Sequence, residues 1–399
     1  MDISSKLSRR TNRMQASAIR EILKVVAQPG MISLAGGIPA PESFPMQIIK
    51  QLTDDVLEEF GATSLQYDKT EGFDPLREQL IPHLEERGVR NINMETLTIF
   101  SGSQGVLDLV AKILITPNDK IAIESPSYLG AISAFNAYEP DYVAVETDDE
   151  GIIPDALEAV LKEHTIKLIY LVPTFQNPTG RTLSLERRKR VAELIQEHDV
   201  LLLEDDPYSA LRYSGTALPP IQQFAPDHVI YSSTFSKILA PGLRIGYCVA
   251  PKILARWLVI AKQGTDLHTQ TFGQAIAALY LSGGYLKAHL PKIIDIYRPR
   301  RDAMLDALET YMPDGFKWTK PDGGMFLWLE APDEVDVDAL YHECVARGVA
   351  FVPGKYFFFD EDLGKSTIRL NFTMINPDAI QNAVATLASA VDAVTQQKV

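Results

Sequence analysis

Short apolar runs alternate with helical patterns through the middle of the chain. The runs are nearly continuous in Val, Ile and Leu, which is typical of strands buried on both faces of a parallel sheet. Segments with helical periodicity lie between several of them, as at Val106–Leu114 and Leu185–Glu197. We therefore predict βαβ units and a mostly parallel sheet. Its strands are predicted at Leu97–Phe100, Lys120–Glu124, Tyr142–Glu146, Ile166–Val172, Val200–Glu204, Val229–Ser232 and Ile245–Ala250.

The pattern changes after about residue 290, where Lys292–Tyr311 predicts one long charged helix. The remaining pattern is typical of a smaller α+β unit. It predicts strands at Met325–Glu330, Val349–Val352 and Thr367–Phe372 and helices at Val337–Arg347 and Pro377–Thr395. The first fifty residues show no strand pattern. We expect an α/β fold with a large domain over residues 50–290, a small domain over 291–399, and an N-terminal segment, 1–50, that joins the small domain.

Composition and charge exclude several classes of function. The net charge of −14 argues against a nucleic-acid surface and against binding to anionic membranes. No apolar run is long enough to span a bilayer, and the first twenty residues lack the apolar core of a signal peptide, so a cytoplasmic protein is expected. The seven histidines are scattered, and no metal site is predicted. The two cysteines, Cys248 and Cys344, predict no disulfide framework and are expected to be buried.

The segment Ser232–Gly246, with the sequence SSTFSKILAPGLRIG, carries the most chemistry. Lys237 lies close to Thr234 and Ser236, and Arg244 follows seven residues later. Hydroxyl groups and a guanidinium are suitable partners for a phosphate monoester. A partly desolvated lysine keeps its amine available for a Schiff base. Taken alone, Lys237 could equally be a solvated loop lysine.

This segment resembles the lysine signature of the class I and II aminotransferases, which have fold type I and use pyridoxal 5′-phosphate. The resemblance extends over nearly the whole chain, and it implies that Lys237 binds the cofactor as a Schiff base. The stretches SAIREILKV, SLAGGIPAPESFP and LQYDKTEG are most similar to the 2-aminoadipate/kynurenine aminotransferase subgroup. The implied fold has a large domain around a mostly parallel sheet and a smaller α+β domain.

The resemblance assigns further residues to the cofactor phosphate. Ser103 and Gln104, in the loop SGSQG, are expected at the start of a helix whose free N–H groups suit a dianion. By itself this loop could also be an ordinary turn. Thr234, Ser236 and Arg244 are expected at the same phosphate. Tyr67, in LQYDKTEG, resembles a tyrosine that reaches the phosphate across a homodimer interface, which would make each site depend on two chains.

Four residues are expected to contact the cofactor ring. Tyr128, in ESPSY, is expected to stack on it, with a core tyrosine as the alternative. Asn177, in PTFQNPTG, and Tyr208, in EDDPY, are expected to hydrogen-bond its 3′-oxygen. Asp205 is assigned to the pyridine nitrogen, because a carboxylate there keeps the ring protonated and improves it as an electron sink. Acids flank Asp205 on both sides, so the role could fall one residue away, although the spacing to Tyr208 favours Asp205.

Other residues are expected to contact the substrate. Arg369 lies in an alternating strand and is expected to bind the α-carboxylate bidentately, with a surface charge as the alternative. Gly37 is expected to let the backbone approach the substrate, and Asn177 to lie beside it. Arg20, in the N-terminal helix, is a candidate partner for acidic side chains, although a solvated helix arginine explains it equally well.

The function implied is a ping-pong transfer of an amino group from an L-amino acid to a 2-oxo acid, expected to be 2-oxoglutarate. The donor could be 2-aminoadipate, an aromatic amino acid or a branched-chain amino acid. Lys237 is expected to move the substrate Cα proton, first as base and then as acid. The same motifs serve C–S lyases and decarboxylases, and some transcription regulators carry this fold, so both alternatives stay open.

Overall fold

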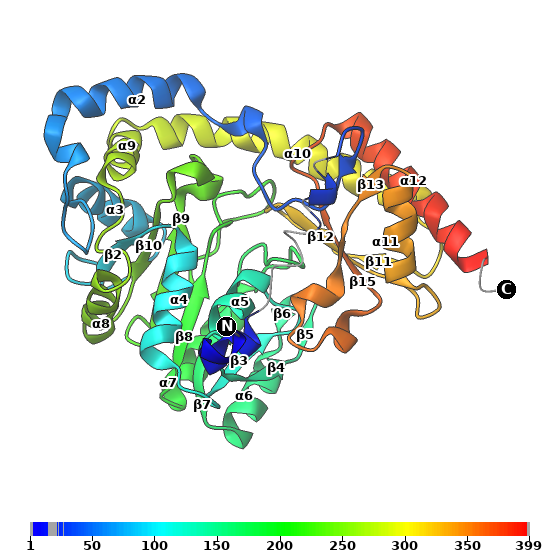
Figure 1. Ribbon diagram of the computed structural model, residues 1–399, viewed down its shortest axis with the longest axis horizontal. Helices are drawn as coiled ribbons and strands as arrows, with labels where there is room; N and C mark the ends of the chain where they lie inside the picture. Colours follow the sequence, from blue (N-terminus) through cyan, green and yellow to red (C-terminus); the bar gives the residue numbers. More distant parts are fainter. Residues whose placement is uncertain (1–2, 15–21, 23, 27, 397–399) are drawn as a thin grey trace.

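A seven-stranded sheet organises the larger part of the molecule (Figure 1). The computed structural model describes residues 3–14, 22, 24–26 and 28–396. The strand order is β2-β10-β9-β8-β7-β3-β4, and all neighbours are parallel except β10, which is antiparallel to both β2 and β9. The predicted mostly parallel sheet is therefore confirmed. The strands are β2 (Leu97–Phe100), β3 (Lys120–Glu124), β4 (Asp141–Val145), β7 (Ile166–Leu171), β8 (Leu201–Asp205), β9 (Val229–Thr234) and β10 (Gly246–Val249).

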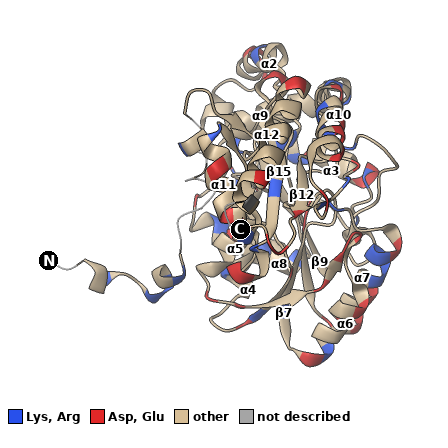
Figure 2. Ribbon diagram, turned by 90° about the vertical axis from the view of Figure 1, so that its right-hand side faces the viewer, with Lys and Arg blue, Asp and Glu red and all other residues tan. Residues whose placement is uncertain are grey.

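Both faces of this sheet are buried, which explains the continuous apolar runs. Along β7, Leu168 and Tyr170 belong to one hydrophobic core, whereas Ile169 and Leu171 belong to another. Figure 2 shows charged residues along α6 and α7, whereas β9 carries none. The helices are α2 (Met46–Glu59), α3 (Asp74–Glu86), α4 (Ser103–Leu114), α5 (Leu129–Asn136), α6 (Pro154–Glu163), α7 (Leu185–Glu197), α8 (Lys252–Gln263) and α9 (Thr271–Ser282). None of the helices in the described part of the chain is long and apolar enough to cross a bilayer.

A smaller antiparallel sheet has the order β11-β12-β15-β14. The long helix α10 (Tyr285–Tyr311) runs from the seven-stranded part to this smaller part in Figure 1. The predicted boundary near residue 290 falls inside α10, and the domain division stays a prediction. The remaining elements here are β11 (Lys317–Trp318), β12 (Phe326–Glu330), α11 (Val337–Ala346), β14 (Val352–Pro353), β15 (Thr367–Asn371) and α12 (Pro377–Gln396).

Two strand predictions are wrong. The expected strand Val349–Val352 is divided into β13 (Val349–Ala350) and β14, which belong to different sheets. The first fifty residues do contain a strand, β1 (Ile32–Ser33), which pairs in parallel with β13. Strands of two residues have no periodicity to detect, so only the tertiary pairing defines them. A two-stranded hairpin, β5 (Thr147–Asp148) and β6 (Gly151–Ile152), completes the described sheets.

The buried guanidinium of Arg188, on α7, holds the loop that follows β7. Its side chain donates to the carbonyl oxygens of Leu183 at 2.8 Å, Pro173 at 2.7 Å and Pro219 at 3.1 Å. Arg188 is only 1% exposed. Pro173 and Leu183 lie at the two ends of the loop that contains Asn177. The guanidinium therefore fixes both ends of the loop through the buried carbonyl oxygens of Pro173 and Leu183.

Replacement of Arg188 by Met should lower the free energy of unfolding by about 3 kcal/mol or more, because buried acceptors lose a charged donor. The matched control is Arg190→Met on the same helix, where ion pairs with Glu158, Glu193 and Glu197 are screened by solvent and should contribute little. Urea unfolding of both variants measures the difference. Equal losses in the two variants would contradict the structural role of Arg188.

Candidate active site

A cavity of about 390 Å³ lies where the strands β7, β8 and β9 end. The carboxyl edge of a parallel sheet is the usual position of a ligand site in α/β folds. The lining combines residues from this edge with residues from the N-terminal segment and from β15. They are Gly37, Ile38, Ser103, Gln104, Tyr128, Val172, Asn177, Asp205, Pro207, Tyr208, Thr234, Ser236, Lys237, Pro241, Arg244 and Arg369. Every predicted site residue lines this cavity except Tyr67 and Arg20.

Lys237 is half-buried in this cavity at the end of a 3-10 turn, Phe235–Lys237, that follows β9. Its Nζ donates to the carbonyl oxygen of Gly37 at 3.1 Å. Loss of hydration in the cavity and, to a smaller extent, the positive charges of Arg244 and Arg369 together lower the pKa of Lys237 to about 8. A large fraction of the amine is therefore neutral near pH 8, as a nucleophile that attacks a carbonyl requires.

Asp205, at the end of β8, is 2% exposed and only half satisfied. Its Oδ2 accepts a hydrogen bond from Tyr170 at 3.0 Å, whereas its Oδ1 has no partner among the described residues. Burial raises the pKa of Asp205 to about 7, and the neighbouring Asp206 raises it as well. A buried carboxylate oxygen without a donor is costly. The protonated nitrogen of a pyridine ring would supply the missing donor and a compensating charge, so this residue fits pyridoxal phosphate.

A cradle for a phosphate lies at another wall of the cavity. Ser103 begins α4 directly after Gly102, whose φ of 82° gives the chain its turn into the helix. The hydroxyl oxygens of Thr234 and Ser236 lie 2.9 Å apart. Arg244 adopts a left-handed backbone conformation with φ of 55°. Two hydroxyls, a guanidinium and a helix N-terminus line one cavity, and together they suit a dianionic phosphate.

Tyr128 and Gln104 belong to two neighbouring helices at this cavity. Tyr128 precedes α5, and burial together with the charge of Asp205 raises the pKa of its phenol. Gln104, on α4, donates from its side-chain amide to the carbonyl oxygen of Gly130 at 2.7 Å. This bond ties the start of α4 to the start of α5, which places the phenol ring of Tyr128 beside the phosphate cradle.

Arg369 is held between two aromatic rings in the interior, so its reading as a surface charge is wrong. Its guanidinium lies 4.5 Å from the ring centre of Phe326 and 4.8 Å from that of Phe357. It donates to Asn177 Oδ1 at 3.1 Å and to the carbonyl oxygen of Ala35 at 2.6 Å. Burial lowers the pKa of Arg369 to about 10, which leaves it charged near neutral pH. No carboxylate among the described residues pairs with it, so it is available to an anionic ligand.

Asn177 and Tyr208 lie side by side, as expected. Asn177 Nδ2 donates to the Tyr208 hydroxyl at 3.4 Å, and Asn177 Oδ1 accepts from Arg369. The ring of Tyr208 meets that of Phe326 edge to face at 5.8 Å. An added Cβ on Gly37 would approach the Phe326 ring to 3.3 Å, so a side chain at this position would crowd the cavity. These contacts connect the cofactor side of the cavity to the side chain of Arg369.

Two predicted residues are not placed in the cavity. Tyr67 is 77% exposed and contacts the ring of His268 edge to face at 5.7 Å. Its role across an interface stays a prediction. Arg20 lies outside the described residues.

Several contributors were not anticipated from the sequence. Tyr170, which donates to Asp205, was assigned only to an apolar strand. A single phenol in the strand that neighbours β8 could have indicated a hydrogen-bond donor for Asp205. Ile38, which is 47% exposed and lines the cavity, directly follows Gly37. Phe326 and Phe357 gave no signal, because aromatic residues in a core pattern have no special spacing. Their role depends on where β15 places Arg369.

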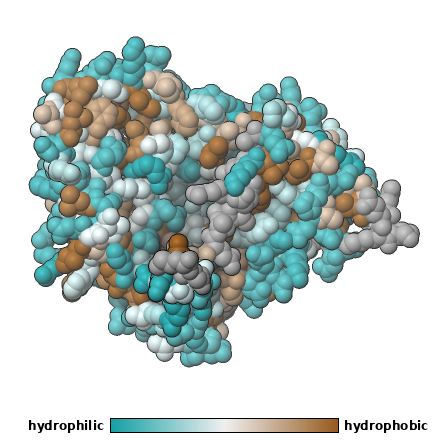
Figure 3. All heavy atoms as spheres, viewed as in Figure 1, coloured by the Kyte–Doolittle hydropathy of each residue, from teal (hydrophilic) through white to brown (hydrophobic). Residues whose placement is uncertain are grey.

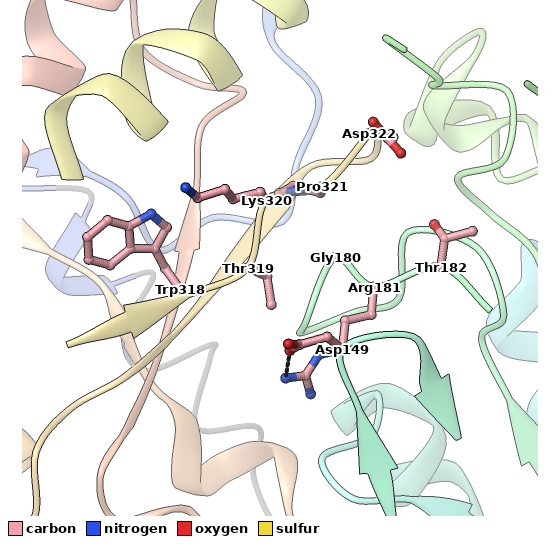
Figure 4. A pocket seen from close by; sticks show the side chains of 9 residues that line it. All are labelled: Asp149, Gly180, Arg181, Thr182, Trp318, Thr319, Lys320, Pro321 and Asp322. Carbon is pink, nitrogen blue, oxygen red and sulfur yellow. Dashed lines mark hydrogen bonds and ion pairs between the residues drawn. The ribbon is translucent and has the colours of Figure 1, made fainter. Parts of the chain in front are cut away.

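A second cavity of about 390 Å³ opens between the β5–β6 turn, the loop after β7 and the segment after β11 (Figure 4). There Arg181 already pairs with Asp149 at 3.1 Å. The side chains of Trp318 and Lys320 extend away from Arg181 in the view of Figure 4. No residue predicted for the active site lines this cavity, and we place the candidate site in the first one.

The chain is similar to known aminotransferases over nearly its whole length. The profile of the family "Aminotransferase class I and II" matches residues 30–387. The aromatic-amino-acid aminotransferase 1 of Thermococcus litoralis is 48% identical over 98% of this chain and 95% of its own. The crystal structure of Pyrococcus horikoshii kynurenine aminotransferase in complex with PMP superimposes with a TM-score of 0.94, at 45% identity over 98% of both chains. The alpha-aminoadipate aminotransferase of Thermus thermophilus, complexed with N-(5′-phosphopyridoxyl)-L-leucine, gives 0.92 at 36% identity over 100% of both chains.

The buried Asp205 should destabilise the chain without cofactor. Because its pKa of about 7 exceeds its ordinary value, the folded state binds an extra proton between about pH 4 and pH 7, and stability falls as the pH rises through that window. Asp205→Asn removes this cost. Without cofactor, the variant should be more stable than the parent, and its advantage in free energy of unfolding should grow by about 2 kcal/mol between pH 5 and pH 8. Urea unfolding at both pH values measures the difference, and a constant difference would show that Asp205 ionises without penalty.

Proposed function

We propose, since the chain belongs to the class I and II aminotransferases, that it moves an amino group from aromatic L-amino acids to a 2-oxo acid with pyridoxal 5′-phosphate bound at Lys237. The observation that carries this proposal is that Lys237, Asp205 and Arg369 line one cavity. The chain is an aminotransferase, so the C–S lyase, decarboxylase and regulatory alternatives are set aside. The phosphopyridoxyl ligand of the Thermus relative supports the cofactor.

The cavity residues divide the work of holding the cofactor. Pyridoxal phosphate, when bound, supplies an electron-poor ring that makes the substrate Cα proton acidic. Asp205 holds the ring nitrogen in its protonated form, and Asn177 and Tyr208 donate to the 3′-oxygen. The phosphate is bound by five groups. They are Ser103, Gln104, Thr234, Ser236 and Arg244, all of which line the cavity.

Lys237 and Arg369 act on the substrate. Arg369 binds the α-carboxylate with its two terminal nitrogens and so fixes the orientation of the Cα–H bond. The neutral amine of Lys237 would then take the proton from the substrate Cα and, now as an acid, deliver it to the C4′ carbon of the bound cofactor. Arg369 is 1% exposed, and its burial limits the water that would compete for the substrate carboxylate. The same Arg369 can bind the carboxylate of the 2-oxo acid acceptor, which is proposed to be 2-oxoglutarate in a ping-pong sequence.

The proposed donor is aromatic because the described lining has no spare cation. Its three cations are Lys237, Arg244 and Arg369, and each already has a role at the cofactor or at the α-carboxylate. Ile38 and Tyr128 present apolar and aromatic surface to the cavity instead. The 48% identical relative is an aromatic-amino-acid aminotransferase, which agrees with this donor. A 2-aminoadipate donor, as in the Thermus relative, would need a further cation, and Arg20 is the candidate.

The active form is proposed to be a homodimer in which Tyr67 reaches the phosphate of the partner subunit. The exposed face of α8 carries Ile253, Trp257 and Ile260, which are 75%, 55% and 45% exposed. Figure 3 shows apolar atoms on the left of the surface, the side on which α8 lies in Figure 1. Residues 3–14 project from the body in Figure 2. Apolar stripes and projecting segments of this kind are typical of surfaces that a second chain covers.

Lys237→Ala should lower turnover by at least about 10⁴-fold, because both the covalent attachment and the proton transfer are lost. Its purified form should also lack the absorbance band of lysine-bound pyridoxal phosphate. Lys252→Ala, at a 70% exposed lysine paired with Glu95, is the matched control and should behave like the parent. Steady-state rates and absorbance spectra test this. Full turnover by Lys237→Ala would exclude the proposed chemistry.

A donor screen with 2-oxoglutarate as acceptor should give phenylalanine or tyrosine a kcat/KM at least about tenfold above that of 2-aminoadipate. The reason is that a second carboxylate, left unpaired in this cavity, costs about 1–3 kcal/mol or more in binding. Leucine should fall between the two. A preference for 2-aminoadipate would reverse the donor assignment and would make Arg20 the first residue to mutate.

A further inference from the structure

A second buried carboxylate, Asp206, directly follows Asp205 but lies on the other side of the sheet. Asp205 accepts from Tyr170, which belongs to the core on one face, whereas Asp206 accepts from Tyr231, which belongs to the core on the opposite face. Asp206 is only 6% exposed. The aminotransferase chemistry uses Asp205 and gives Asp206 no part. The contacts of Asp206 therefore need an explanation of their own.

Asp206 is fully surrounded by donors, and one of them is a cation. Its Oδ2 accepts from Tyr231 at 2.7 Å and from the Ser209 hydroxyl at 2.7 Å, and its Oδ1 accepts from the Ser209 backbone N–H at 3.1 Å. Arg87, which follows α3, lies with Nη2 3.2 Å from Oδ2 and also contacts the Ser209 hydroxyl. Arg188 acts on Asp206 at longer range only, since its N–H groups bond carbonyl oxygens and Thr174. Arg87 is thus the direct charge partner of Asp206.

The charge of Asp206 matters because of what faces Asp205. The titratable groups that act on Asp205 or on which it acts are Tyr170 from β7, Tyr128 at the start of α5, Tyr208 after β8, and Asp206 itself. The cations of the same cavity, Lys237, Arg244 and Arg369, form no ion pair with Asp205. The three phenols are neutral at physiological pH, because burial raises the pKa of each. Asp206 is therefore the charged group in this set, and a like charge favours the protonated form of its neighbour. An unpaired Asp206 would draw the proton from the pyridine nitrogen onto Asp205.

We propose that Arg87 is a positioning residue for the cofactor: by neutralising Asp206 from the opposite face of the sheet, it keeps Asp205 ionised against the pyridine nitrogen. This inference rests on the proposed binding of pyridoxal phosphate. Arg87 touches neither cofactor nor substrate in this arrangement, because it lies outside the cavity lining. Its effect passes through the adjacent carboxylates alone. If Arg87 only anchored the end of α3, its replacement would change cofactor affinity by the same factor whether or not Asp206 carried a charge.

The test is a titration of the full-length chain with pyridoxal 5′-phosphate, comparing the parent, Arg87→Met, Asp206→Asn and the double variant. Arg87→Met should weaken cofactor binding about tenfold, equivalent to one unit in the pKa of Asp205. Asp206→Asn should bind as tightly as the parent or more tightly. The double variant, which removes both charges, should recover to within about threefold of the parent, as a charge-coupled pair requires. Arg90→Met is the control and should bind the cofactor normally, because the exposed Arg90 side chain, near the end of α3, donates to the backbone carbonyl oxygens of Glu85 and Val89 and not to Asp206.

Two outcomes would overturn the proposal: unchanged cofactor affinity in Arg87→Met, or a double variant that binds as weakly as Arg87→Met. If Arg87→Met does not fold, the Asp206→Asn variant tests the proposal by itself. A tenfold loss of affinity for pyridoxal phosphate in Asp206→Asn would show that Asp206 acts through its geometry and would exclude the charge effect. A parent chain that does not bind pyridoxal phosphate would refute the proposed function itself. A different result would refute only the role of Arg87. In that case the parent and Arg87→Met would both bind pyridoxal phosphate normally, whereas Asp205→Asn would not bind it.

Discussion

The separation of opposite charges inside one buried cavity is the constraint on which this site depends. Asp205 bonds Tyr170, Lys237 bonds the Gly37 carbonyl oxygen, and Arg369 bonds Asn177 and Ala35. The buried carboxylate thus forms no ion pair with either cation, although all three line the same space. Charges held apart in this way are costly in the empty chain. They are also preorganised, so a ligand with complementary charges is bound without rearrangement of the site.

The cavity exists because the N-terminal segment is tied to the small sheet. Leu34 donates to Ala350 at 2.7 Å and accepts from Asn371 at 2.8 Å, and Thr373 donates to the Ile38 carbonyl oxygen at 3.0 Å. These bonds place Gly37 over Lys237 while Arg369 reaches in from β15. The side that binds the substrate and the side that binds the cofactor therefore belong to different sheets. Any shift of the small sheet would move Arg369 relative to Lys237, so the precision of the site depends on the packing between the two.

Behind the large sheet lies a second layer of buried charge that supports the first. Glu204 accepts the backbone N–H groups of Ile221 and Gln222, both at 2.9 Å, and Arg188 binds the ends of the loop that carries Asn177. Alternation along β8 places Glu204 and Asp206 on the face opposite Asp205. Buried groups of this kind are tolerated because each has several hydrogen-bond partners. They hold the strand ends in position without touching the cavity themselves.

The large sheet and the residues expected at its carboxyl edge could be predicted from local sequence patterns. Long apolar runs predict strands from local sequence alone, and a motif that follows a buried parallel strand is expected at the carboxyl edge of the sheet. For this reason Asn177, Asp205 and Lys237 could be predicted together, and in the structure they line one cavity. Tertiary structure alone decided the rest. The pairing of β1 with β13, the aromatic rings around Arg369 and the cation beside Asp206 join segments far apart in the chain. Periodicity and spacing report only local preference, whereas these contacts depend on which distant surfaces bury each other's charge and apolar area.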